Sequence, residues 1–229
     1  MRERPIIFSA PMVRAILDGR KTQTRRVVKP QPAAGVRRSV FAVSGLEDGH
    51  GREIRLSYGV PGDRLWVRET GEILSAAQDH DPIQNQDVWY DVGWRHLCDG
   101  TIIAKDGHHG RLTEFVDECA TERKPAIFMP RWASRLTLEI TAVRVQRVQD
   151  ISEADAEAEG CEPAIAGTCG DGDVLHTYRT GFVRLWNEIN GKKSGRTWLD
   201  SPWVWALTFR VMRDAPRWTG ADTKADLPR

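Results

Sequence analysis

The apolar residues of this sequence recur mainly with the period of short β-strands, and few segments have the period of a helix. Residues 61–69 combine a Pro-Gly-Asp turn with alternating side chains, and residues 135–148 alternate along their whole length. Helical periodicity is limited to residues 11–18, 151–160 and 178–190. This order predicts a mostly β fold with short helices, of the α+β class, and favours a small closed or partly open barrel.

Glycines and capping residues predict where the helices begin and end. Gly19 follows the first helical segment at the position where a left-handed conformation is often needed. Ser152 and Asp155 have the spacing of a capping box, and Gly160 is placed to end that helix. The remaining strands are expected at residues 5–9, 21–28 and 201–212.

Two long segments lack the regular pattern of the rest. Residues 29–60 are rich in Pro, Gly, Ser and Arg, and we expect a long loop there. Residues 70–124 are expected to be an insertion with small strands of its own. The tail from residue 214 has no core pattern, which predicts disorder and leaves residues 1–213 as one domain.

Charge and hydropathy narrow the classes of partner. The net charge is +1, but ten of the twelve charged residues up to residue 38 are cations. Such an end forms either a phosphate-facing patch or an ordinary solvated surface. No apolar run approaches the ~20 residues that cross a bilayer, and the apolar part of the first residues is too short for a signal peptide, so we expect a cytoplasmic protein with no membrane partner.

The cysteines do not predict a disulfide framework. None of the four forms a C-x-x-C pair, and reduced thiols are expected in a cytoplasmic chain. The one local group of metal-ligating residue types comprises Cys98, His108, His109 and Cys119. Its spacing is looser than that of ordinary zinc sites, and we assign neither a metal nor another cofactor.

The segment 16–26 contains the most informative polar pattern. Gly19 turns the chain out of a helix and into a strand. Strand alternation then places Lys21 with Gln23 on one face and Thr24 on the other. Lys21 and Thr24 therefore converge only if the junction twists Lys21 away from regular pleating.

This segment, Ile-Leu-Asp-Gly-Arg-Lys-Thr-Gln-Thr-Arg-Arg, resembles the signature of the ASCH family, G-x-K followed by Thr or Ser and then Arg. Within that family it is similar to the I-L-x-G-R-K-T-x-T-x-R run of the small bacterial N4-acetylcytidine amidohydrolases. Residues 61–69 resemble the family's G-D-x-L-x-V strand. Residues 151–160 match its L/I-[ST]-E-x-x-A-x-x-E segment, whose last acid aligns with Glu159.

The resemblance covers about half of the chain. Residues 182–212 resemble the helix-plus-strand ending of longer ASCH proteins from phages and prophages, whereas residues 29–60 and 70–124 have no counterpart in the minimal amidohydrolases. The fold that it implies is a PUA-like ASCH β-barrel with large loop insertions.

The resemblance also implies roles for three residues. Thr24 would attack the acyl carbonyl, Lys21 would take its proton as the base, and Glu159 would relay a proton to the leaving amine. Arg26 would stabilise an oxyanion or bind a sugar or phosphate. The further residues that we expect to bind substrate are Arg20, Trp66, Arg68, Glu69, Arg131 and Trp132.

Three functions are compatible with these residues. The first is a hydrolase that removes an acyl group from N4-acetylcytidine or a related N4-acylated base. The second is a non-catalytic module that binds RNA or modified DNA, and the third is a ribonuclease. The expected ligand is a modified nucleoside or a nucleic acid, with RNA favoured over DNA. No oligomeric state follows from the sequence.

Overall fold

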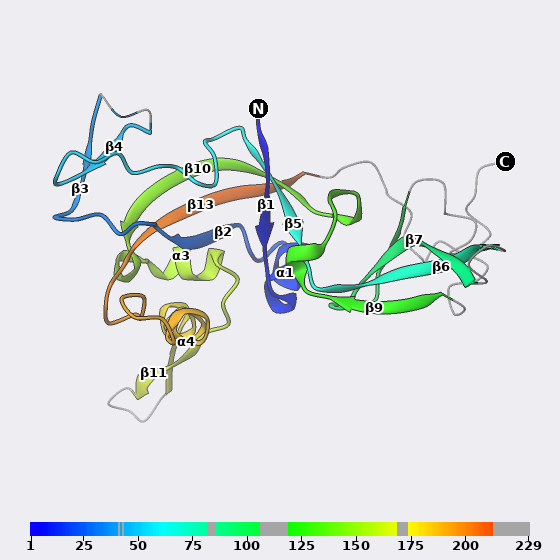
Figure 1. Ribbon diagram of the computed structural model, residues 1–229. Coiled ribbons are helices and arrows are strands. Elements are labelled where there is room, and N and C mark those ends of the chain that lie inside the picture. Colours follow the sequence, from blue (N-terminus) through cyan, green and yellow to red (C-terminus); the bar gives the residue numbers. More distant parts are fainter. Residues whose placement is uncertain (41, 43, 82–85, 106–118, 169–173, 213–229) are drawn as a thin grey trace. The chain divides into compact units, whose positions relative to one another are not determined.

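In the computed structural model the chain divides into two compact units (Figure 1). The first unit comprises Met1–Arg2, Ala15–Arg64 and Glu139–Arg210. The second comprises Glu3–Arg14, Leu65–Leu138 and Val211–Arg229. The structure describes the whole chain except residues 41, 43, 82–85, 106–118, 169–173 and 213–229. A single domain over residues 1–213 stays a prediction.

Three neighbouring strands, in the order β10-β13-β2, form the sheet of the first unit. Strands β13 and β2 are antiparallel, with Leu207 opposite Thr24 and Trp205 opposite Arg26. The elements that lie wholly or mostly in this unit are β2 (Gln23–Val27), β3 (Val36–Arg38), β4 (Leu46–Asp48), β10 (Thr137–Arg147), η4 (Val148–Asp150), α3 (Glu153–Ala158), β11 (Ala164–Thr168), β12 (Val174–Thr177), α4 (Tyr178–Asn190) and β13 (Trp203–Met212).

Helices α3 and α4 pack against each other over the apolar core of this unit. The core residues are Val148, Ile151, Ala156, Cys161, Phe182, Trp186 and Val204. Phe182 and Trp186 are one helical turn apart, with ring centroids 5.8 Å apart. The helical periodicity predicted for residues 178–190 thus places these two residues in the core, whereas Ile189 near the end of α4 is exposed.

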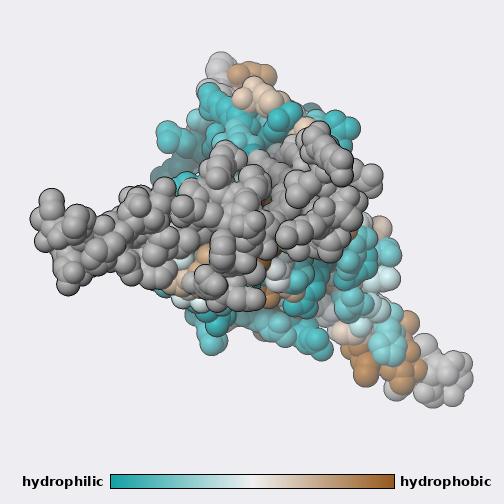
Figure 2. Space-filling model, turned by 90° about the vertical axis from the view of Figure 1, so that its right-hand side faces the viewer, coloured by the Kyte–Doolittle hydropathy of each residue, from teal (hydrophilic) through white to brown (hydrophobic). Residues whose placement is uncertain are grey.

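Two β-hairpins extend the first unit. Strands β3 and β4 form a short antiparallel ladder, with Arg38 opposite Leu46, in the segment for which the sequence predicted only a loop. Strands β11 and β12 form the second hairpin. Figure 2 shows apolar residues at this hairpin, where Ile165, Val174 and Leu175 are exposed.

The second unit contains a four-stranded sheet in the order β8-β7-β6-β9. The sequence correctly predicted strands within this insertion. The elements that lie wholly or mostly in this unit are β1 (Glu3–Ile7), α1 (Ala10–Leu17), β5 (Arg64–Arg68), β6 (Gly71–Asp81), β7 (Gln86–His96), β8 (Ile102–Ala104), β9 (Ala120–Lys124), η2 (Ala126–Phe128) and η3 (Arg131–Ala133).

A tryptophan packed on a glycine anchors this sheet. Trp94 is fully buried and packs with Met129 and Ala133. A Cβ on Gly71 would lie 2.2 Å from Trp94 Nε1, so only glycine leaves room for the indole at that position.

The α+β prediction is confirmed, since strands predominate and the helices are short. The described strands form open sheets, and no closed barrel is found among them. In the first unit β2 pairs with β13, and Lys21, just before β2, pairs with Glu159 after α3. The predicted disordered tail lies outside the described residues. No helix in the described residues is long and apolar enough to span a membrane.

Candidate functional site

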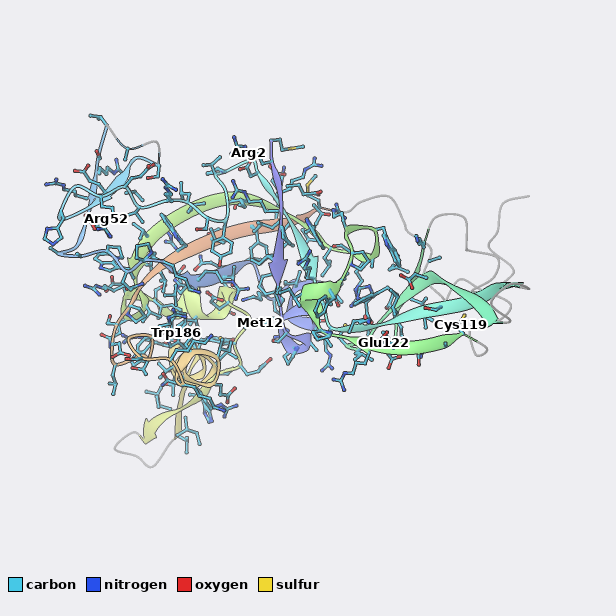
Figure 3. All side chains as sticks on the ribbon, in the orientation of Figure 1. Arg2, Met12, Arg52, Cys119, Glu122 and Trp186 are labelled. Atoms are coloured by element: carbon cyan, nitrogen blue, oxygen red, sulfur yellow. The ribbon has the colours of Figure 1, made fainter. Side chains whose placement is uncertain are left out.

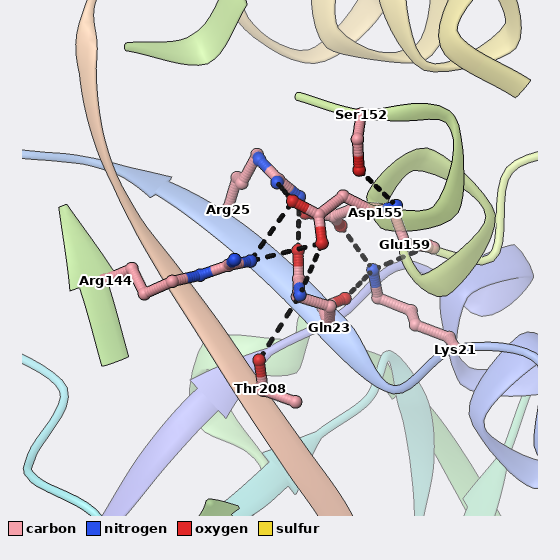
Figure 4. Close-up of polar contacts among 8 residues, drawn as sticks. All are labelled: Lys21, Gln23, Arg25, Arg144, Ser152, Asp155, Glu159 and Thr208. Atoms are coloured by element: carbon pink, nitrogen blue, oxygen red, sulfur yellow. Dashed lines mark hydrogen bonds and ion pairs between the residues drawn. The ribbon is translucent and has the colours of Figure 1, made fainter. Parts of the chain in front are cut away.

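The end of α1 delivers Lys21 to the end of α3. Gly19 has a φ of +75°, as its predicted role at the helix end requires. Lys21 N then donates to Ala15 O at 2.9 Å. Lys21 and Glu159 also form an isolated antiparallel bridge, so that backbone pairing fixes two residues 138 positions apart (Figure 4).

The Lys21 amine is fully engaged within the protein. Its Nζ donates to Glu159 Oε2 at 2.8 Å, to Glu159 O at 2.8 Å and to Gln23 O at 2.9 Å. Three donated hydrogen bonds account for the three protons of an ammonium group. The side chains of Lys21 and Glu159 are 0% and 4% exposed, so this ion pair is enclosed.

Arg25 supplies a second cation to the same carboxylate. Its Nη1 donates to Glu159 Oε1 at 3.1 Å and its Nη2 to Asp155 Oδ2 at 2.8 Å. The same Nη1 also donates to the side-chain oxygen of Gln23, at 2.7 Å. Glu159 therefore bridges a buried lysine and a buried arginine, which offsets the cost of removing three charges from water.

A more exposed set of contacts borders this cluster. Arg144 donates to both oxygens of Asp155 at 3.1 Å, and Gln23 Nε2 donates to Asp155 at 3.2 Å and to Thr208 Oγ1 at 3.3 Å. Partial burial raises the pKa of the Asp155 carboxyl, but Arg144 and Arg25 outweigh it and hold that pKa below its usual value. Asp155 thus belongs to the polar network, whereas its sequence position indicated a capping role.

The backbone at the end of α3 is fitted closely to Lys21. Gly160 has a φ of +74°, and a Cβ there would lie 2.9 Å from both Ala15 Cβ and Lys21 Cβ. Ser152 Oγ accepts from Asp155 N at 3.1 Å and caps the start of the helix. Both ends of this short helix are therefore defined by the residue types that the sequence singled out.

Thr24 is buried on β2, between Gln23 and Arg25, whose side chains enter the network. Since side chains alternate along a strand, Thr24 faces the other side of the sheet with Arg26. Burial lowers the pKa of the Arg26 guanidinium, while Tyr58 and Glu159 act in the opposite direction. The structure thus brings Lys21 and Glu159 together, and Thr24 is not a member of their hydrogen-bond network.

Arg20 borders a cavity of about 380 Å³ beside this junction. Its guanidinium pairs with Asp18 and Glu162, each at 3.1 Å. Thr22 and Gly160 also line the cavity. They directly follow Lys21 and Glu159 in the sequence, whose side chains form the buried ion pair.

The other predicted substrate-binding residues lie in the second unit. Arg68 and Arg131 stack on Trp66, with their Cζ atoms 4.6 and 5.7 Å from a Trp66 ring centroid. Arg131 also forms an ion pair with Glu3 at 2.7 Å. Trp132 packs at the edge of the Trp94 core. These aromatic residues therefore have intramolecular partners.

Glu69 belongs to a second buried polar cluster. Arg135 donates to both of its oxygens, at 3.0 and 2.8 Å, and His96 Nδ1 lies 3.3 Å from Oε2. Burial raises the pKa of Glu69, but His96 and Arg135 outweigh it and lower that pKa to about 2. Burial, with Glu69 nearby, raises the pKa of the Cys98 thiol to about 12.

No metal site is supported by the described residues, in which no group of three or more His, Cys, Asp or Glu side chains is suitably placed. Of the four metal-ligating residues noted in the sequence, Cys98 and Cys119 form no disulfide bond, and the Cys98 thiol contacts Glu69 and Arg135. His108 and His109 lie outside the described residues.

Sequence reasoning missed Arg25 and Asp155 as parts of the site. The alternation that places Gln23 with Lys21 also places Arg25 on that face, and this was the available signal. Arg144 and Thr208 come from strands distant in the sequence, and no local motif marks them. The contact of Arg135 with Glu69 likewise needs the folded chain.

Comparisons with known proteins leave the family unassigned. No family model matches the chain, and no curated protein matches it. Among solved structures, it is similar to a protein of Enterococcus faecalis V583 described by the family model DUF984. The two are 10% identical with a TM-score of 0.36, over 93% of this chain and 80% of that one.

Proposed function

We propose that the protein hydrolyses the amide of N4-acetylcytidine or a related N4-acylated base, in the manner that its ASCH-like motifs imply. The observation that carries the proposal is the enclosed Lys21–Glu159 ion pair, formed between the two motif segments. Buried charges that are held by specific partners concentrate at functional sites, because folding alone rarely rewards them.

The chemistry consists of two acyl transfers. Lys21 passes a proton to Glu159 across the 2.8 Å contact, which leaves a neutral amine and a carboxylic acid. The amine then takes the Thr24 hydroxyl proton as Oγ1 attacks the acyl carbonyl. Glu159 protonates the departing N4 amine, and water then releases the acyl group as a carboxylic acid and restores the threonine.

This sequence of steps sets a geometric requirement. In the substrate complex the Thr24 hydroxyl and the Lys21 amine must come within hydrogen-bond distance, about 2.6–3.2 Å. The twist of the chain between Gly19 and Gln23 is where such an adjustment would occur, since Lys21 precedes the regular part of β2. Arg26, on the Thr24 face, is the residue that we assign to the developing oxyanion.

A second function, a non-catalytic module that binds a base in RNA or modified DNA, is favoured by a different observation. All three Lys21 protons are engaged within the protein, and Gln23 and Arg25 complete the network. A binding module needs such a network only for rigidity and does not need Thr24 as a nucleophile.

The test is the release of cytidine from N4-acetylcytidine by the purified protein. We expect turnover by the wild type and a loss of at least about a hundredfold in Glu159→Gln, because the proton relay is removed. Glu188→Gln on α4 is the matched control, since that carboxylate is 64% exposed and does not line the cavity at Arg20, and it should retain the wild-type rate. Circular dichroism would establish that both variants are folded at the assay temperature.

An absence of cytidine release by a folded wild type would reject amide hydrolysis of this substrate. Retention of base binding in that case, measured by titration with N4-acetylcytidine, would select the binding module. An equal rate in wild type and Glu159→Gln would place any hydrolysis at another site.

A further inference from the structure

The segment 29–60, which the ASCH motifs do not cover, forms a cavity of its own. Its volume is about 420 Å³, within the range of small-molecule sites. It lies in the first unit, between the chain that leaves β2 and the turn that follows β4. The residues that line it are Lys29, Pro30, Gln31, Pro32, Asp48, Arg52, Glu53, Ile54 and Arg55.

The acidic side chains of the cavity accept hydrogen bonds from backbone N–H groups of the same segment. Asp48 Oδ1 accepts from His50 N at 3.0 Å and from Arg52 N at 2.9 Å, and its side chain is buried. Glu53 Oε1 accepts from Ser44 N at 3.0 Å. These carboxylates hold the turn together.

The cations of the cavity have no such partners. In the described part of the chain, no ion pair or side-chain hydrogen bond engages Lys29, Arg52 or Arg55. All three are exposed, and Figure 3 labels Arg52 beside β4. Asp48 is near enough to Arg52 to feel its charge, but Asp48 is held mainly by backbone N–H groups.

Residues 20–55 contain nine cations and three acids. Four of these cations are held in ion pairs, so only those of the cavity itself are available to a ligand there; the four are Arg20, Lys21, Arg25 and Arg37. Gln31 ties one wall of the cavity to β13, since its side chain donates to Val28 O and accepts from Trp203 N, at 2.7 and 2.8 Å. The cavity thus has fixed walls and three cations against two carboxylates, and both carboxylates are engaged by backbone N–H groups.

The position of the cavity connects it to the proposed active site. Strand β2 carries Arg25 of the Lys21–Glu159 network and ends two residues before Lys29. Lys29 is the fourth residue after Arg25, so at the rise per residue of an extended chain the cavity begins on the order of 10 Å from Arg25. A free acylated nucleoside is uncharged and gains nothing from three cations at that distance, whereas phosphates joined to the base would bind them.

We propose that the cavity formed by Lys29, Arg52 and Arg55 binds backbone phosphates of a single-stranded polynucleotide, whose acylated base is presented to the Lys21–Glu159 site. This inference rests on the proposed function for the base and adds the substrate class. It predicts that the preferred substrate is a modified base within a chain rather than the free nucleoside.

The test is the binding of a single-stranded RNA of about ten nucleotides, measured by fluorescence anisotropy over a series of salt concentrations. We expect the triple variant Lys29→Gln, Arg52→Gln, Arg55→Gln to lose at least about tenfold in affinity. The slope of log K against log salt should fall by about 2, since each lost phosphate contact on a single strand removes about 0.7. The matched control is Arg184→Gln, Lys192→Gln, Lys193→Gln, which removes three exposed cations from α4 and its following turn.

Equal losses in the two triple variants, or no RNA binding by the wild type, would overturn the inference. Cytidine monophosphate that binds as tightly as the RNA would overturn the polymer assignment. The outcome is separable from the proposed function, because hydrolysis of free N4-acetylcytidine should be unchanged in the cavity variant. RNA binding through the cavity without any hydrolysis would reject only the amidohydrolase.

Discussion

The charged side chains of the candidate site are held together by contacts between residues that are far apart in the sequence. Lys21 and Glu159 could be predicted from the two motif segments, because each segment carries a distinctive residue pattern. Arg25 could not be assigned a partner from the sequence, since its contacts with Glu159 and Asp155 require the end of α3 to lie against β2. Sequence reasoning thus finds the residues of a local motif and misses those that tertiary packing adds.

A residue-scale prediction concerns Gly160. Gly160→Ala should destabilise the protein by more than Gly19→Ala, because both glycines have a positive φ but only Gly160 has Lys21 and Ala15 within 2.9 Å of a new Cβ. We expect about 1 kcal/mol for the backbone strain at either position and an additional loss at Gly160 alone. Urea unfolding of the two variants measures both values, and equal destabilisation would contradict the described packing at Lys21.

The position of α4 is set by a close approach between its backbone and another segment of main chain. A Cβ on Gly181 of α4 would lie 1.9 Å from Glu162 O, so α4 sits directly on the backbone that follows α3. The sequence predicted the helix from its apolar periodicity, and two residues of that periodic set, Phe182 and Trp186, lie in the core. It gave no sign of this contact, because a single glycine within a helical pattern does not identify what it touches.

At the scale of elements, Gly181→Ala should displace α4 from the α3 side of the core. We expect a lower midpoint of thermal unfolding, even though alanine favours helix more than glycine does. Gly167→Ala in β11 is the matched control, since a Cβ there meets nothing within 4 Å. A stabilised Gly181→Ala variant would show that α4 does not pack on Glu162 as described.

At the scale of the whole molecule, the sequence predicted the mostly β class and strands within the insertion at residues 70–124. It did not predict the open sheets or the β3–β4 hairpin, because its segment of Pro, Gly, Ser and Arg lacks a period from which pairing could be inferred. The buried Glu69–Arg135 cluster likewise arises from residues 66 positions apart. Whether a segment forms a strand depends on its local sequence, whereas the pairing of strands and the closure of a sheet depend on contacts across the whole fold.

Stability should depend on the protonation of Glu69. Its folded pKa, about 2, is below that of an unfolded glutamate, so its contribution is present above about pH 4.5 and is lost as pH falls toward 2. The shift corresponds to about 3 kcal/mol for this buried group. Urea unfolding between pH 6 and 2.5 should show a smaller loss for Glu69→Gln than for the wild type, and parallel curves would contradict the assignment.

The central claim is that Thr24 carries out the acyl transfer with Lys21 as its base, and the most direct measurement is cytidine release by two Thr24 variants. Thr24→Val keeps the size of this buried side chain and removes the hydroxyl, and Thr24→Ser keeps the hydroxyl. The account predicts a loss of at least about a hundredfold in kcat for Thr24→Val and a rate within about tenfold of wild type for Thr24→Ser. Equal rates for Thr24→Val and the wild type would contradict it.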